Sequence, residues 1–215
     1  MIDRISRRAV IFWSLAVAIL AAAVIALAAH GAPSTTLASA DRRDANLVTT
    51  AVGRMPLDEA LALFRAGLPE VTRFEHGAVD GRALIDQFVA AVERSDTASA
   101  RALVMSRAEF AYLYFPHAPY ARPPFRQDPA LTWFLLLQDS RKGITRVFNR
   151  FAGEPGRLID YSCSEQPRQH GPFRLWSDCR MTVRERRGER ATLRLFGPIV
   201  EYGGRYKFLT YANDL

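Results

Sequence analysis

The densest set of side chains that could line a binding pocket lies between positions 110 and 134. This segment holds eight aromatic residues and one histidine, and five prolines interrupt it. Aromatic rings can wall an apolar cavity, while tyrosine hydroxyls and an imidazole can orient a ligand or move a proton near neutral pH. The alternative, which the composition favours, is a hydrophobic core joined to a proline-stiffened loop. The candidate pocket residues are Tyr112, Tyr114, His117, Tyr120 and Trp133.

No other group of residues has the spacing of a known catalytic or metal site. The sequence lacks G-x-S-x-G, phosphate-loop, dinucleotide-binding and His-Glu metal motifs. His76 and His170 lie in loop-like contexts that favour solvated imidazoles. Asp139 and Asp160 are candidate pocket carboxylates, although Asp160 alternates out of phase with its apolar neighbours and should face solvent. The sequence therefore predicts neither a nucleophilic mechanism, nor a metal centre, nor a cofactor.

The only two cysteines are expected to form a disulfide. Cys163 and Cys179 lie in consecutive strand-like runs, 157–165 and 173–185, joined by a turn-rich segment around Gly171. A hairpin centred on Gly171 places every apolar pair on one face, and such a face selects the register. Free buried thiols or an incomplete metal site are the alternatives, but no CxxC spacing is present. The predicted pairs are Ile159 with Val183, Tyr161 with Met181, and Cys163 with Cys179.

The N-terminus has the pattern of a membrane-targeting segment. Arg4, Arg7 and Arg8 precede 21 uncharged residues at positions 9–29, and about 20 apolar residues span a bilayer as a helix. An Ala38-Ser39-Ala40 pattern before Asp41 resembles a signal-peptidase site. We therefore predict that residues 1–30 are a transmembrane anchor or a cleaved signal peptide, with the anchor favoured. Residues 31–54 would be a linker, and the folded part would lie in the cell envelope outside the cytoplasm.

The net charge of +7 does not indicate nucleic-acid binding. Its arginines are scattered and have acidic neighbours, as in Arg184-Glu185-Arg186-Arg187-Gly188-Glu189-Arg190. A nucleic-acid site would show basic residues clustered on one face with aromatic platforms. No nucleic-acid partner is expected.

The periodicity predicts helices followed by strands. A short helix and a connection occupy residues 55–79, and further helices are expected over 81–94, 96–105 and 111–115. Asp128-Pro129 starts a longer helix that weakens near Gly143 or Gly153. Four strands follow at 157–165, 173–185, 190–202 and 205–212. This order predicts an α+β domain over residues 80–215, with helices packed on one face of a curved antiparallel sheet of about four strands.

Two stretches resemble a known superfamily. The run "LIDQFVAAVERSDTASARALV" and the helix-then-strand order resemble the nuclear transport factor 2-like superfamily, a cone-shaped α+β fold. The closing "LFGPIVEYGGRYKFLTYANDL" resembles the ends of uncharacterised bacterial envelope proteins. The resemblance implies a pocket between sheet and helices. No position matches the acid–base pair of enzymatic members, and Glu109 is better explained as part of a helix cap, in the form Ser106-x-x-Glu109.

These observations favour a non-catalytic binding or interaction module at the outer face of the inner membrane. Its partners would be the membrane, through the N-terminal helix, and an unknown protein or a small apolar ligand. The alternative is a lyase or isomerase that uses the cone pocket. Titratable side chains converging in the pocket would favour the enzyme, whereas an apolar lining would favour the module.

Fusion of residues 1–54 to a reporter that is active only outside the cytoplasm should give activity. The reason is that the basic flank stays in the cytoplasm while the uncharged run enters the bilayer. A matched fusion with two arginines placed inside residues 9–29 should lose activity. Activity of a cytoplasm-specific reporter on the unaltered segment would contradict export.

Overall fold

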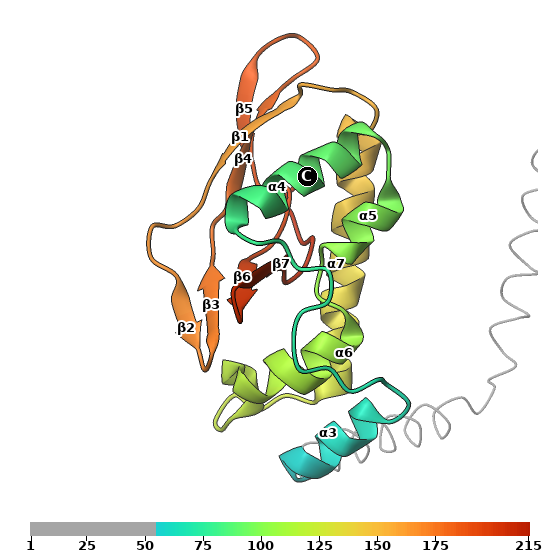
Figure 1. The fold of residues 1–215 in the computed structure, drawn as a ribbon, viewed down its shortest axis with the longest axis vertical. Coiled ribbons are helices and arrows are strands. Elements are labelled where there is room, and N and C mark those ends of the chain that lie inside the picture. The colour runs from blue at the N-terminus through green and yellow to red at the C-terminus, as the bar shows by residue number, and fades with distance from the viewer. Residues whose placement is uncertain (1–54) are drawn as a thin grey trace, which may run out of the picture. The chain divides into compact units, whose positions relative to one another are not determined.

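The computed structural model describes residues 55–215, which form an α+β unit with antiparallel sheets (Figure 1). The predicted membrane segment 1–30 and linker 31–54 lie outside the described residues. Within residues 55–215, no helix combines the length and apolarity needed to cross a bilayer. Figure 1 shows the long helix α7 running along the side of the domain away from strands β1 to β5.

The helices occupy the first part of the unit, as predicted. Helix α5 ends at Ala102, short of the predicted Met105, because the next residues pair with strand β7 instead. Val104 bridges Phe208 in parallel, and the Met105 N–H donates to the Phe208 carbonyl at 2.9 Å. The α-helices are α3 (Leu57–Arg65), α4 (Gly81–Glu93), α5 (Thr97–Ala102), α6 (Arg107–Glu109) and α7 (Pro129–Phe151). A π-helical turn (Phe110–Tyr114) and two 3₁₀ turns (Phe115–His117, Pro119–Ala121) follow α6.

Side-chain caps fix where these helices begin. Asp80, Asp96 and Asp128 accept backbone N–H groups of α4, α5 and α7, respectively. The predicted capping box is present, since Ser106 Oγ accepts the Glu109 N–H and Glu109 Oε2 accepts the Ser106 N–H. The predicted starts of these helices are therefore confirmed.

Seven short strands in two antiparallel sheets replace the four strands predicted. One sheet has the order β1-β4-β5 and the other β2-β3-β6-β7. The predicted strands at 173–185 and 190–202 are each broken, so the chain passes from one sheet to the other at residues 177–179 and 194–198. The strands are β1 (Leu158–Ser162), β2 (Arg168–His170), β3 (Phe173–Trp176), β4 (Arg180–Arg184), β5 (Arg190–Leu193), β6 (Ile199–Tyr202) and β7 (Arg205–Phe208).

The register between β1 and β4 confirms one predicted pair and corrects another. Tyr161 pairs with Met181 as expected, but Val183 pairs with Leu158 rather than Ile159. An irregularity between Leu158 and Asp160 shifts the ladder by one residue. The shift turns Leu158 into the core, where it is buried, and it leaves Ile159 only half-buried.

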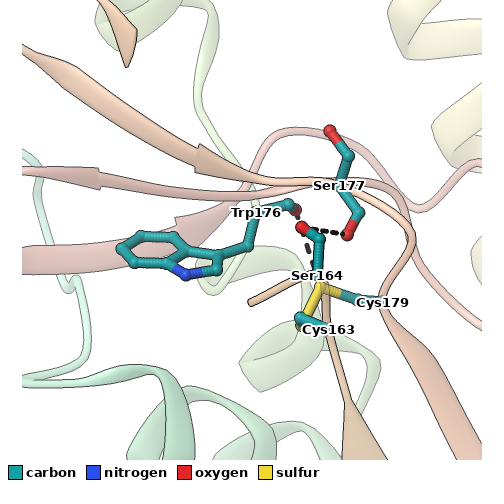
Figure 2. The surroundings of a disulfide bond; sticks show 5 residues. All are labelled: Cys163, Ser164, Trp176, Ser177 and Cys179. Atoms are coloured by element: carbon teal, nitrogen blue, oxygen red, sulfur yellow. Dashed lines mark hydrogen bonds between the residues drawn. A yellow bond between two sulfur atoms is a disulfide. The ribbon is translucent and has the colours of Figure 1, made fainter. Parts of the chain in front are cut away.

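The predicted disulfide between Cys163 and Cys179 is present. It follows β1 and precedes β4, at the place where the chain leaves one sheet for the other (Figure 2). Around it, both the N–H and the hydroxyl of Ser164 donate to the Ser177 carbonyl, at 3.3 and 3.1 Å. Cys179 Sγ lies 3.5 Å from the carbonyl oxygen of Trp176. The bond therefore ties the end of β1 to the corner between β3 and β4.

Both faces of the four-stranded sheet are covered, which corrects the expectation of helices on one face only. Ile199 and Phe208 belong to a core cluster with α4, the second half of α7 and strands β1 and β4. The neighbouring Val200 belongs to a second cluster with α3 and residues 105–121. Because successive strand residues point to opposite faces, β6 and β7 separate the two clusters.

A buried ion pair lies on the second face. Lys207 Nζ donates to both carboxylate oxygens of Glu109 at 2.9 Å, and the two side chains are 3% and 0% exposed. Glu109 Oε1 also accepts the backbone N–H of Glu75 at 2.7 Å, and Oε2 accepts that of Ser106 at 2.7 Å. One carboxylate thus joins α6, the loop before α4 and strand β7. The carboxylate serves the predicted helix cap, and its lysine partner was not predicted.

Candidate functional site

Three of the five predicted pocket residues meet around Phe110 and Phe173. Tyr114 packs edge-on against Phe173 with ring centroids 5.3 Å apart, and Tyr120 lies 6.4 Å from Tyr114. Trp133 lies 5.3 Å from Phe110. Burial raises the pKa of Tyr114 to about 12. Burial, together with the neighbouring Tyr114, raises the pKa of Tyr120 well above its ordinary value. Both phenols are therefore neutral at physiological pH.

The remaining two predicted residues lie at the edge of this aromatic cluster. The Arg65 guanidinium lies 4.7 Å from the ring centre of Tyr112. His117 is exposed, 6.0 Å from Phe173. His170 is half-buried, and its Nδ1 lies 3.5 Å from the Tyr114 hydroxyl. Burial lowers the pKa of His170, and the positive charge of Arg168 lowers it further. Ligand binding by these residues stays a prediction, and none of them lines the grooves described below.

The other candidate residues lie on the surface. His76 and Asp139 are exposed, as is Asp160, which confirms its predicted solvent orientation. Asp160 lies 3.5 Å from Arg82. Among residues 55–215, no group of three or more His, Cys, Asp or Glu side chains is arranged to hold a metal ion.

A groove of about 810 Å³ runs along α7. Leu137, Arg141, Ile144 and Phe148 recur at alternating spacings of four and three residues, so one stripe of the helix faces it. Helix α5 and the C-terminal segment form the other walls. The lining comprises Thr97, Arg101, Val104, Leu137, Ser140, Arg141, Ile144, Thr145, Phe148, Asn149 and Tyr211.

A close approach of the C-terminal segment to α7 builds one wall of the groove. The Tyr211 N–H donates to Ser140 Oγ at 3.0 Å, and Asn213 Nδ2 donates to the Gly143 carbonyl at 2.8 Å. A Cβ at Gly143 would overlap the Tyr211 carbonyl. Gly143 therefore does not weaken α7, which continues to Phe151; it gives the C-terminal backbone room to pack on the helix.

The groove combines an apolar floor with basic side chains. Val104, Leu137, Ile144 and Phe148 are half-buried, so each keeps accessible apolar surface. Arg101 and Arg141 are exposed, and neither side chain forms an ion pair or hydrogen bond with any residue of 55–215. No carboxylate of residues 55–215 lines the groove. Its electrostatic character is therefore positive.

The side chains of residues 55–215 that line the groove are poorly suited to acid–base chemistry. Its titratable side chains are two arginines and Tyr211. The Tyr211 hydroxyl donates to the Ala100 carbonyl at 2.5 Å, and burial raises its pKa far above the ordinary value. An arginine stays protonated at physiological pH, so no lining group exchanges a proton readily. The helical spacing of Leu137, Ile144 and Phe148 is a usable signal in the sequence, but no signal indicates the approach of α5 and the C-terminal segment.

The comparisons with known proteins identify no relative of this chain. No protein-family model matches the chain, and no curated protein or solved structure matches it either.

Replacing Gly143 by alanine should destabilise the protein by about 1–3 kcal/mol, as overpacking does elsewhere. Helix propensity alone predicts that the substitution stabilises the protein, since alanine is more favourable than glycine in a helix interior by about 1 kcal/mol. The measurement is urea unfolding monitored by circular dichroism. Asp139→Ala, at an exposed position of the same helix, is the control and should change stability little. A stabilised Gly143→Ala variant would show that the C-terminal segment does not pack on α7 in this way.

Proposed function

We propose that this protein is a non-catalytic binding module, and that its α7 groove holds an apolar ligand with an anionic group. The observation that carries the proposal is the apolar floor of the groove, flanked by Arg101 and Arg141, neither of which forms an ion pair within residues 55–215. An arginine forms charge-assisted hydrogen bonds with a carboxylate or phosphate, often in bidentate geometry. The floor supplies the complementary surface for a hydrocarbon portion.

The size of the groove suits a small ligand. Its volume of about 810 Å³ lies within the range of roughly 300–1,000 Å³ that is typical of small-molecule sites. Burial of a hydrocarbon chain contributes about 0.8 kcal/mol per CH₂ group. A chain lying along Leu137, Ile144 and Phe148 would therefore supply affinity, and the arginines would set its orientation.

The lyase or isomerase alternative receives less support. Such a reaction needs a positioned acid and base within reach of the substrate, and the groove lining offers only arginines and a tyrosine with a raised pKa. The aromatic cluster around Tyr114 offers neutral phenols and an imidazole, but its rings pack against one another. These arrangements support the binding module.

Two further parts of the proposal concern family and location. We infer membership of the nuclear transport factor 2-like superfamily from the quoted sequence stretches, with the order of helices before antiparallel strands in support. We place the module at the extracytoplasmic face of the inner membrane, anchored or released by cleavage, because of the N-terminal pattern. A disulfide is consistent with an oxidising compartment.

The test is the binding of laurate to the full-length protein in lipid nanodiscs. Binding is measured by NMR of laurate labelled with ¹³C at its carboxylate, and empty nanodiscs give the background signal. Arg141→Gln and Arg101→Gln should each weaken laurate binding by about tenfold, because a hydrogen bond to a charged group contributes about 1.5–3 kcal/mol. Lys142→Gln, the adjacent exposed cation of α7, is the matched control and should leave binding unchanged. Decanoate should bind about tenfold more weakly than laurate, given two fewer buried CH₂ groups.

Equal effects of Arg141→Gln and Lys142→Gln would mean that only the general positive charge matters, and this would contradict the groove. Absence of any laurate signal above that of empty nanodiscs would also contradict it.

A further inference from the structure

A second groove, of about 480 Å³, lies beside the disulfide. It is bounded by the start of α4, the end of β1, and strands β3, β6 and β7, and it shares no residue with the α7 groove. Cys163 itself lines it, and Figure 2 shows Trp176 extending from the strand next to the bond. The lining comprises Gly81, Arg82, Asp160, Tyr161, Ser162, Cys163, Ser164, Trp176, Ile199 and Tyr206.

Aromatic side chains from three strands wall this groove. Trp176 of β3 and Tyr206 of β7 place their ring centres 5.7 Å apart with an angle of 32° between the planes. Tyr161 of β1 is the third. All three are half-buried, so each ring keeps an accessible part. Together they form an apolar surface that is only partly buried against the core.

Most of the other side chains that line the groove are polar, and the charged ones are balanced. The groove lining carries one cation, Arg82, and one anion, Asp160, which lie 3.5 Å apart and are both exposed. Arg82 Nε also donates to both carboxylate oxygens of Asp86, at 3.0 and 3.3 Å, and its Nη1 faces Asp160. The hydroxyls of Ser162 and Ser164 add neutral hydrogen-bonding groups. Because the two charges offset each other, nothing in the lining selects an ion. A purely apolar ligand would strip water from these polar groups without replacing its hydrogen bonds, which is costly.

We propose that this groove binds a neutral saccharide of one or two pyranose rings. A pyranose has an apolar face of C–H groups and a rim of hydroxyls. The C–H face would pack on Trp176 and Tyr206, as apolar groups do on aromatic rings. The hydroxyls would donate to the Asp160 carboxylate and accept from the Arg82 guanidinium, which are stronger partners than neutral groups. The volume falls within the usual range for small ligands.

The disulfide positions the site. It joins Cys163, two residues after Tyr161, to Cys179, three residues after Trp176. Two of the aromatic rings therefore come from the two segments that the bond holds together. Saccharide binding should weaken when the bond is reduced.

The test is isothermal titration of the full-length protein with cellobiose, maltose and diacetylchitobiose. At least one should bind with a dissociation constant in the millimolar range or tighter. Trp176→Ala and Tyr206→Ala should each weaken that binding by about tenfold, through loss of buried apolar contact. Tyr206→Phe, which keeps the ring, and Phe134→Ala, at an exposed aromatic position on α7, should leave it nearly unchanged.

Circular dichroism would establish that each variant folds. If Trp176→Ala does not fold, Asp160→Asn, at an exposed position, replaces it and should also weaken binding. Failure of all three disaccharides to bind at millimolar concentration would overturn the proposal. So would binding that persists unchanged in Trp176→Ala or, where that variant does not fold, in Asp160→Asn. Laurate binding should be unaffected by Asp160→Asn, so this inference and the proposed function can fail separately.

Discussion

The buried ion pair between Glu109 and Lys207 fixes strand β7 in the fold, and both grooves depend on where that strand lies. Lys207 is held on the second face of the sheet by a carboxylate that also accepts two backbone N–H groups. The two residues that flank Lys207 in the chain help to form the grooves. Tyr206 lines the groove beside the disulfide, and Phe208 binds the backbone of residues 103–105, next to Val104 of the α7 groove. One anchored strand thus supports two separate surfaces.

The second constraint is the passage of the chain between the two sheets. At residues 177–179 the chain leaves the four-stranded sheet for the three-stranded one, and the disulfide holds that corner against the end of β1. At residues 194–198 it returns, where Gly197 lets the Thr210 backbone and hydroxyl approach. The segments joined at the disulfide corner carry Tyr161 and Trp176, two of the three aromatic residues of one groove. The return places β6 beside β7, which the ion pair anchors.

Local chemistry could be predicted from the sequence, whereas long-range pairing could not. Caps such as Asp80 and Asp128, and the cysteine pair, depend on neighbouring residues or on a single hairpin, and these were confirmed. The break after Trp176 was missed because buried residues keep a period of two across it, from Phe173 to Val183; Pro198 was a usable signal for the other break. Lys207 meets Glu109 across 98 residues, and no spacing rule connects them.

A double-mutant cycle in urea unfolding tests the central role of the ion pair most directly. Glu109→Gln and Lys207→Met should each cost about 3–5 kcal/mol, because each leaves a buried charge without its partner. The double variant leaves no charge unpaired, so its loss should be smaller than the sum of the two single losses by at least about 2 kcal/mol, a coupling within the range for residues in contact. Losses that add within about 0.5 kcal/mol, as for independent sites, would contradict the account.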